Sequence, residues 1–227
     1  MTTGDVPEWL QPLLGRIGGA DAPALLPRVG IAPDDARRSA VLVLFGEGRA
    51  GPDVLLIERS AHLRSHAGQP AFPGGGIDDT DDGPVGAALR EAQEETGLDP
   101  TGVTVLVVLP ELWVPPSGNA VTPVVGWWHE PSEVRPQPGE VAAVARVPLG
   151  DLANPSNRLR VRAPSGYLGP AFDVAGMLVW GFTAGVLDRL LDLGGWAQPW
   201  DLDRVQDLPP RALELAMRQR RRSTGNT

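Results

Sequence analysis

The chain has 227 residues, a formal net charge of −8 at pH 7 and no cysteine. Without cysteine there is no disulfide framework and no thiolate metal site. The negative charge argues against a general affinity for nucleic acid or anionic membranes. Its apolar runs stay shorter than the roughly 20 residues that span a bilayer, and the first residues do not have the pattern of a signal peptide. We therefore expect a soluble, cytoplasmic protein with one globular domain and neither a nucleic-acid nor a membrane partner.

The first part of the chain predicts an arm followed by a hairpin. Residues 1–38 carry short apolar pieces between Pro and Gly, so we expect a short helix packed on the domain through Trp9 and Leu13. Two apolar runs of strand length follow, AVLVLF at Ala40–Phe45 and DVLLIE at Asp53–Glu58. The turn residues between them favour an antiparallel pair in a central sheet.

The next stretch, 55–75, places basic residues in front of a Gly- and Pro-rich run. Pro73 and the glycines beside it cannot continue a regular helix, so this is a loop. A cationic loop suits a phosphate-bearing substrate. The alternative is an ordinary solvated surface with incidental histidines. The basic residues are Arg59, His62, Arg64 and His66.

A helix over Pro84–Thr96 is predicted by Pro84 in its first turn and by Gly97 just after its end. At about 100° per residue the apolar side chains gather on one face, and a separate arc presents three carboxylates. These are Glu91, Glu94 and Glu95. Such an oxygen-rich set favours a hard cation such as Mg2+ or Mn2+, whereas the alternative is a solvated acidic face.

The second half of the chain predicts further strands and one more large helix. Strands are expected at Val103–Leu109, Val121–Trp128 and Glu140–Leu149, and a hairpin at 158–172 with Arg158, Arg160 and Arg162 on one face, either solvated or facing substrate phosphates. Between the first two strands we expect a loop at Leu112–Ala120. Pro123 indicates an edge position or a bulge. Helices are expected at Met177–Leu193 and Pro209–Arg222.

The residues around the glutamate helix resemble the Nudix box. That pattern reads G, five residues, E, seven residues, then R-E-U-x-E-E-x-G-U, where U is apolar. The matching residues are Gly76, Asp82, Arg90, Glu91, Ala92, Glu94, Glu95, Gly97 and Leu98. One position departs, because Asp82 stands where the family has Glu. We interpret this as a conservative change that affects fine geometry and not activity.

The preceding segment resembles the signature of coenzyme A diphosphatases, L-L-T-x-R-S, three residues, R, three residues, G, three residues, F-P-G-G. The matching residues are Leu55, Leu56, Arg59, Ser60, Arg64, Gly68, Phe72, Pro73, Gly74 and Gly75. Ile57 replaces the usual Thr. Because the signature runs without a gap into Gly76, the two resemblances support each other. Together they cover roughly Ala40 to Leu193.

The resemblance implies an α/β fold, a Nudix-type α/β/α sandwich with a mixed central sheet, over residues 39–200. The residues that follow predict a C-terminal helix and a basic tail over 201–227. It also implies hydrolysis, dependent on Mg2+ or Mn2+, of the diphosphate in coenzyme A or acyl-coenzyme A. The products would be 3',5'-ADP and a 4'-phosphopantetheine. A diphosphate repels an attacking hydroxide, so divalent cations are needed to screen its oxygens.

Residue roles carry over position by position from the resemblance. The matches to the family's metal ligands are Glu91, Glu94, Glu95 and the carbonyl of Gly75. Arg90 is expected to orient Glu94. Glu91 is our first choice of general base, and Glu140 is its rival. The residues expected to contact substrate are Arg59, Ser60, Arg64, Gly68, Phe72 and Ser117.

Two other functions remain open from the sequence. The same glutamates would serve a hydrolase of ADP-ribose or another nucleoside diphosphate derivative, with a different pocket. A non-catalytic nucleotide-binding regulator is the second alternative, and Asp82 is the feature in its favour. In each case the partner is a small nucleotide, and a homodimer is one option for the assembly.

Overall fold

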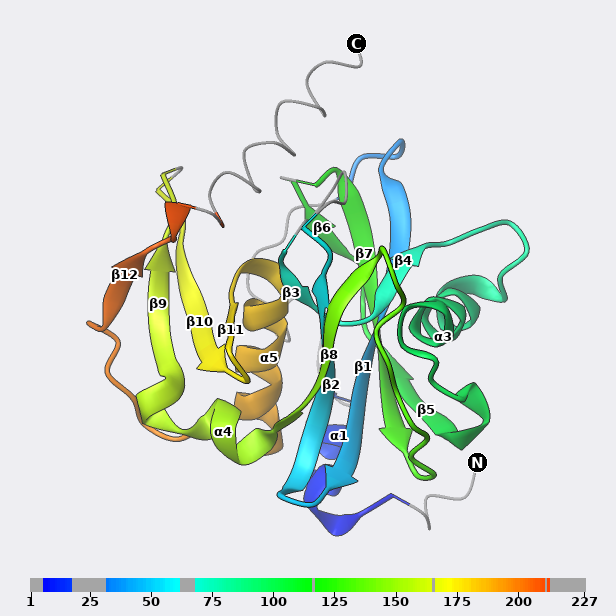
Figure 1. Cartoon of the computed structure of the whole chain (residues 1–227), viewed down its shortest axis with the longest axis horizontal. Helices are drawn as coiled ribbons and strands as arrows, with labels where there is room; N and C mark the ends of the chain where they lie inside the picture. The colour runs from blue at the N-terminus through cyan, green and yellow to red at the C-terminus, as the bar shows by residue number, and fades with distance from the viewer. Residues whose placement is uncertain are drawn as a thin grey trace.

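The centre of the molecule is a mixed β-sheet with helices on both faces, an α/β/α sandwich as predicted (Figure 1). The structure is a computed structural model and describes residues 6–17, 32–61, 68–115, 117–164, 166–210 and 212. Within these ranges the sheet has 8 strands, in the order β3-β2-β1-β7-β5, with β4, β6 and β8 paired beside β1, β7 and β2. The strands are β1 (Arg37–Gly48), β2 (Gly51–Arg59), β3 (Pro70–Ala71), β4 (Gly74–Gly76), β5 (Val103–Val108), β6 (Leu112–Val114), β7 (Asn119–Trp128) and β8 (Val141–Pro148).

The predicted hairpin is confirmed, and its strands are buried on both faces. β1 and β2 pair antiparallel, whereas β1 and β7 run parallel. Along β1, Leu42 and Leu44 pack toward helix α3 (Gly83–Thr96), and Val43 and Phe45 pack on the opposite side. A strand covered on both faces reads as a continuous apolar run, which is why the sequence shows no alternation there.

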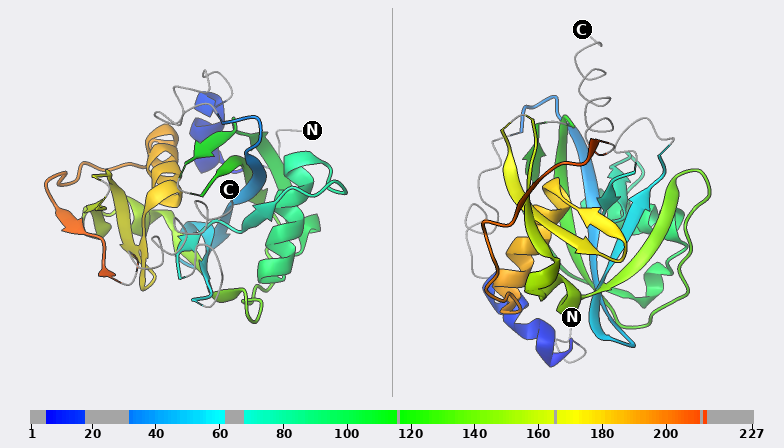
Figure 2. Two further views of the ribbon diagram at one scale, coloured as in Figure 1. Left: turned by 90° about the horizontal axis from the view of Figure 1, so that it is seen from above. Right: turned by 60° about the vertical axis from the view of Figure 1, so that its left-hand side comes forward.

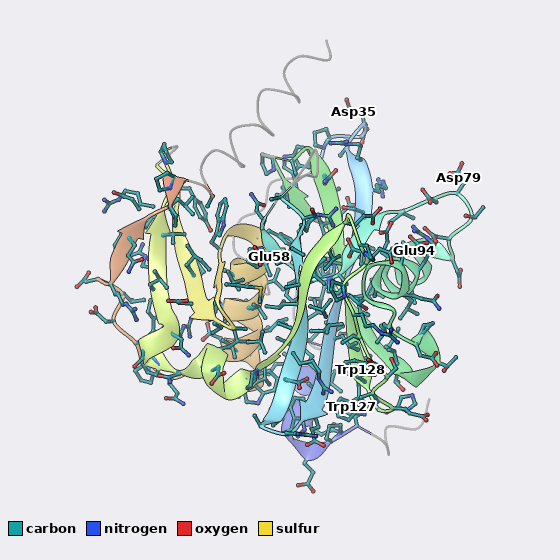
Figure 3. The ribbon with its side chains drawn as sticks, viewed as in Figure 1. Asp35, Glu58, Asp79, Glu94, Trp127 and Trp128 are labelled. Atoms are coloured by element: carbon teal, nitrogen blue, oxygen red, sulfur yellow. The ribbon has the colours of Figure 1, made fainter. Side chains whose placement is uncertain are left out.

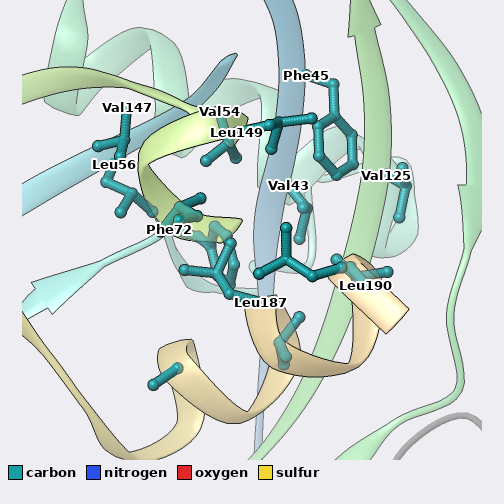
Figure 4. Close-up of a cluster of buried hydrophobic side chains, with 14 of the residues drawn as sticks. Val43, Phe45, Val54, Leu56, Phe72, Val125, Val147, Leu149, Leu187 and Leu190 are labelled. Carbon is teal, nitrogen blue, oxygen red and sulfur yellow. The ribbon is translucent and has the colours of Figure 1, made fainter. Parts of the chain in front are cut away.

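The second face of the sheet is covered by α5 (Gly181–Gly194) and by the N-terminal arm, as Figure 2 shows. Figure 4 shows Leu187 and Leu190 of α5 packing against side chains of β1 and β2. The arm contains a 3-10 turn, Glu8–Leu10, and helix α1 (Gln11–Ile17). The predicted anchors are confirmed: Leu13 is fully buried, and Trp9 makes an edge contact with Phe45.

A smaller mixed sheet lies beside α5. Its 4 described strands have the order β11-β10-β9-β12. They are β9 (Arg158–Arg162), β10 (Leu168–Val174), β11 (Met177–Val179) and β12 (Val205–Asp207). Helix α4 (Leu149–Ala153) and the 3-10 turns Pro155–Asn157 and Pro100–Gly102 complete the described elements. β12 lies beyond the predicted domain end at residue 200 and still pairs with β9.

Several predicted elements need correction. The predicted helix at Met177–Leu193 is wrong in its first residues, because β11 returns along β10 through a turn at Ala175 and Gly176, whose φ angles of 52° and 74° suit a tight hairpin. The predicted loop at Leu112–Ala120 contains strand β6. Only the first residues of the predicted helix at Pro209–Arg222 are described.

Pro123 is not on an edge strand, since β7 pairs with β1 on one side and with β5 and β6 on the other. Its carbonyl accepts from the Leu109 N–H at the junction where the partner of β7 changes from β5 to β6. A residue without an N–H is tolerated where the ladder is interrupted. Trp127 and Trp128 lie on opposite faces and are both buried, so both pack.

The strand pairs diverge at one end of the sheet, and this positions the glycine-rich segment. β1 pairs with β2 only over Phe45–Gly48, and its earlier residues Ser39–Val41 pair with β4. The end of β2 likewise pairs with β3. Residues 70–76 therefore lie between β1 and β2 and lead directly into the loop before α3.

Across the described residues, no helix has both the length and the apolar character needed to cross a bilayer.

Candidate active site

Helix α3 begins and ends close to its predicted limits. Pro84 lies in the first turn, and Gly97 ends the helix with φ 70° in the left-handed region. Ala88 and Ala92 are fully buried against the sheet, so the predicted packing face is confirmed. The three glutamates come from the other side of this helix. They differ in exposure, because Glu94 is 57% exposed while Glu95 is 2% exposed.

Arg90 is the centre of the contacts on this helix. Its Nη1 donates to Glu91 Oε1 at 3.0 Å and to Glu94 Oε2 at 3.2 Å, and its Nη2 donates to the carbonyl of Gly76 at 3.0 Å. The predicted contact with Glu94 is present, and Glu91 shares it. Arg90 therefore links both carboxylates to the glycine strand β4.

The acid that binds Arg90 through both of its carboxylate oxygens is Asp81. Arg90 Nε donates to Asp81 Oδ1 at 2.8 Å, and Nη2 donates to Oδ2 at 3.0 Å. Hydrogen bonding by Arg90 lowers the pKa of the Asp81 carboxyl to about 2 and raises the pKa of Arg90. The residue selected by motif spacing, Asp82, caps the start of α3 without a side-chain hydrogen bond. Sequence reasoning missed Asp81, although the acidic run DDTDD contained the signal.

Glu95 connects α3 with the two strands in front of it. Its Oε1 accepts from Arg59 Nη1 at 2.6 Å, and its Oε2 accepts from the Gly74 N–H at 2.9 Å. Burial raises the pKa of Glu95 to about 7, an effect larger than the opposing effects of Arg59 and the Gly74 N–H. The alternative of a solvated acidic face is thus wrong for Glu95, because Arg59 and strand β4 cover its carboxylate.

Glu91 lies against the backbone of Gly75. A Cβ at position 75 would collide with the Glu91 carboxylate, so only glycine allows this close approach. Gly75 itself pairs with Ala40 of β1. Burial raises the pKa of the Glu91 carboxyl, and the hydrogen bond from Arg90 acts in the opposite direction. A carboxylate held beside the backbone of β4, with 19% of its side chain exposed to solvent, is well placed to act on a ligand.

The donor chemistry of this site fits a hard divalent cation. Carboxylate and carbonyl oxygens are the ligands that Mg2+ and Mn2+ prefer. Glu91 and Glu94 share one donor nitrogen of Arg90, so their oxygens lie near each other. In the side-chain positions of the described residues, no three His, Cys, Asp or Glu groups converge tightly enough to hold an ion. Binding by Glu95 as well would require it to exchange its contacts with Arg59 and Gly74.

The residues predicted to contact substrate fall into different environments. Arg59 and Gly68 close the base of the loop, since the Gly68 N–H donates to the Arg59 carbonyl at 2.8 Å. The Ser60 N–H donates to the Glu140 carbonyl at 2.8 Å. Arg64, His62 and His66 lie outside the described residues.

The side chains of Phe72 and Ser117 are both buried. Phe72 is buried in the core between the sheet and α5, where Figure 4 shows it close to Leu187, so it packs. The Ser117 hydroxyl donates to the Val114 carbonyl at 3.0 Å and is buried, so it stabilises the β6–β7 turn. Both side chains are used by the fold itself.

Glu140 lies at the start of β8 with an exposed side chain. The segment before it is attached to the end of α3, where the Gln137 N–H donates to the Glu95 carbonyl at 3.0 Å and the Arg135 N–H to the Thr96 carbonyl at 2.8 Å. This segment therefore forms a wall beside Glu95 and Ser60, and Glu140 stands at its end.

A mixed sheet between helices, with a glycine strand leading through an acidic loop into an Arg- and Glu-bearing helix, defines a domain of the Nudix type. The family model described as the NUDIX domain matches residues 35–167. The chain belongs to the NUDIX domain family.

Relatives and solved structures agree with this assignment. The Nudix hydrolase NudL of Shigella flexneri is 46% identical over 125 residues, which cover 55% of this chain and 64% of that protein. NudL of Escherichia coli strain K12 is 45% identical over the same length and with the same coverage. The matched region thus spans less than two thirds of these relatives. The crystal structure of the Nudix hydrolase RenU from M. smegmatis has a TM-score of 0.51 and 23% identity, covering 73% of this chain and 90% of that one, which is a likeness of fold.

Proposed function

We propose that the chain is a hydrolase that cleaves the diphosphate of coenzyme A or an acyl-coenzyme A, releasing 3',5'-ADP and a 4'-phosphopantetheine. The observation that carries the proposal is the contact between Arg59 and Glu95 at 2.6 Å. It joins the segment that resembles the coenzyme A diphosphatase signature to the helix that resembles the Nudix box. The similarity to NudL supports the hydrolase class, since the name of that relative states the class without a substrate.

In the proposed reaction a water oxygen attacks one phosphorus atom of the diphosphate, and the bridging P–O bond breaks. The bridging oxygen stays on the other phosphate, and the proton removed from water passes to a carboxylate. We propose Glu91 as this base, because it is largely covered from solvent and held by Arg90 beside Gly75. Glu140 is the rival, since its side chain is exposed at the end of the segment that lies beside Glu95.

We propose that Glu91, Glu94, Glu95 and the carbonyl of Gly75 hold Mg2+ or Mn2+. A divalent cation bound there would screen the diphosphate oxygens and lower the pKa of the attacking water. Arg59 is proposed to donate from its guanidinium to a substrate phosphate, which can accept two such bonds in parallel. Arg64, Ser60 and Gly68 belong to the same proposed phosphate loop.

The test incubates the purified protein and Mg2+ with one substrate at a time and identifies the products by chromatography. The substrates are coenzyme A, acetyl-coenzyme A, ADP-ribose, NADH and diadenosine polyphosphates. We expect 3',5'-ADP from both coenzyme A species at the highest kcat/KM. Faster turnover of ADP-ribose would instead support a nucleoside diphosphate hydrolase. Nucleotide binding by calorimetry without turnover of any substrate would identify a regulator.

A further inference from the structure

The loop between β4 and α3 presents several acids to Arg90, and only one of them pairs with it fully. Asp81 binds the guanidinium through both oxygens, at 2.8 Å and 3.0 Å, and its side chain is only 5% exposed. The Asp78 carboxylate lies 3.6 Å from Nη2 of the same guanidinium and is 71% exposed. A two-oxygen contact fixes the plane of a guanidinium, which a single charge contact does not.

The position of Asp81 follows from the turn that contains it. The Asp81 N–H donates to the Asp78 carbonyl at 3.0 Å, and the Asp78 N–H donates to Asp81 Oδ2 at 2.8 Å. These two bonds position the Asp81 carboxylate in addition to its contact with Arg90. Asp82 is one residue further on, is exposed, and precedes Gly83, whose φ of 61° redirects the chain into α3. The spacing of the Nudix box selects Asp82, but the turn directs its neighbour toward the arginine.

Each nitrogen of Arg90 then has a defined partner. Nε and Nη2 face Asp81, Nη2 also reaches the Gly76 carbonyl, and Nη1 faces Glu91 and Glu94. Because the guanidinium is planar, fixing one edge against Asp81 fixes where Nη1 points. The orientation of Glu91 and Glu94 therefore depends on Asp81 through Arg90.

We propose that Asp81, and not Asp82, is the positioning residue that holds Arg90 and thereby orients Glu91 and Glu94. The inference rests on the proposed function for its catalytic consequence. The pairing itself is independent of turnover.

The test compares three identical changes in one loop: Asp81→Asn, Asp82→Asn and Asp79→Asn. Asp79 is exposed at the outer part of the loop, as Figure 3 shows, and serves as the matched control. The first measurement is the 1H–15N signal of Arg90 Nε–H, without metal or substrate. We expect slow solvent exchange in the wild type and in the Asp79 and Asp82 variants, and fast exchange in Asp81→Asn. A protected signal in Asp81→Asn, or its loss in Asp82→Asn, overturns the proposal.

The second measurement is direct binding of Mn2+ by the substrate-free protein, followed by electron paramagnetic resonance. Loss of a residue that orients metal ligands costs about 10- to 100-fold in affinity or activity. We expect a loss in that range for Asp81→Asn, a fall in kcat with little change in KM, and near wild-type values for Asp79→Asn and Asp82→Asn. Equal losses in Asp81→Asn and Asp82→Asn contradict the assignment.

A cycle with Arg90→Lys separates positioning from a general effect on the fold, because lysine has no fork of donors to be held. If Asp81 acts through Arg90, Asp81→Asn lowers Mn2+ affinity in the wild type and adds little in the Arg90→Lys background. Fully additive losses overturn the proposal. If Asp81→Asn does not fold, Asp81→Ser takes its place, because it also removes the carboxylate and should give the same loss of Nε–H protection and of Mn2+ affinity. Absence of turnover in every variant and in the wild type would count against the proposed function, while the Nε–H signal still tests the pairing.

Discussion

Two arginines, Arg90 on α3 and Arg158 on β9, show how the same side chain serves two different purposes in this molecule. Arg90 is 28% exposed and contacts several carboxylates together with a backbone carbonyl. Arg158 is 2% exposed, pairs with Asp188 of α5, and lies over the rings of Phe172 and Trp200 at 5.1 Å and 4.6 Å.

The two sites differ in the number of carboxylates around the arginine. Around Arg90 the negative charges outnumber the single positive charge, so carboxylate oxygens remain available at a partly exposed surface. Around Arg158 one acid balances one base, and aromatic rings cover the rest of the guanidinium. The first arrangement suits binding of a cation, and the second connects the small sheet, α5 and the segment that follows it. This also corrects the expectation for the 158–162 strand, where Arg158 is neither solvated nor directed at substrate.

The largest expected effect is at the Arg90 site. Glu91→Gln removes the proposed base and should lower kcat about 100- to 10,000-fold, the range for loss of a general base, with circular dichroism unchanged. Turnover of coenzyme A with Mg2+ measures it. Glu130→Gln, an exposed glutamate after β7, is the control and should be neutral. Full activity of Glu91→Gln would remove Glu91 from the chemistry and favour Glu140.

The next effect is at the Arg158 site and concerns stability. Asp188→Asn leaves a buried guanidinium without its counter-charge, which costs about 3–5 kcal/mol in fully buried pairs. We expect a loss of about 2–3 kcal/mol here, because the Asp188 side chain is 33% exposed. Urea unfolding measures the loss, and kcat per folded molecule should stay unchanged. The control is Asp207→Asn in the same sheet, whose exposed pair with Arg162 at 3.6 Å should contribute at most about 1 kcal/mol. A loss of kcat in folded Asp188→Asn would contradict the separation between the two arginines.

A smaller effect is expected from Glu95 and depends on pH. Its pKa of about 7 in the folded protein exceeds the ordinary value of 4.5, so in the pH range between them the folded protein retains a proton that the unfolded chain releases. The free energy of unfolding should therefore fall as pH rises from about 4.5 to about 7, and level off above that. Thermal unfolding of the metal-free protein at a series of pH values measures the slope.

Glu95→Gln is the control for this slope, because the glutamine carries no titrating proton. The difference in unfolding temperature between wild type and variant should change across the same pH window. A constant difference would show that Arg59 keeps the Glu95 carboxyl ionised throughout. The Arg59–Glu95 pair would then resemble the Arg158–Asp188 pair, in which one acid balances one base, and would differ from the cluster of acids around Arg90.

Much of the fold was predictable because its signals are local. Pro84 and Gly97 mark the limits of α3, and the apolar runs of β1 and β2 mark strands buried on both faces. The hairpin that carries β11 was missed, since Met177–Val179 suits a helix as well as a strand. Only its pairing with β10 decides between them.

The sequence by itself determined the family, the glutamate helix and the loop in front of it, because these depend on residue types at fixed spacing. Tertiary structure decided which of these residues meet. Arg59 and Glu95 are 36 residues apart, and they touch because β1 and β2 diverge and admit β3 and β4 between them. The same is true of the acid that meets Arg90. Motif spacing selects Asp82, whereas the backbone turn places Asp81 against the guanidinium. Side-chain direction in a loop depends on the φ and ψ angles of each residue, and motif spacing carries no record of them.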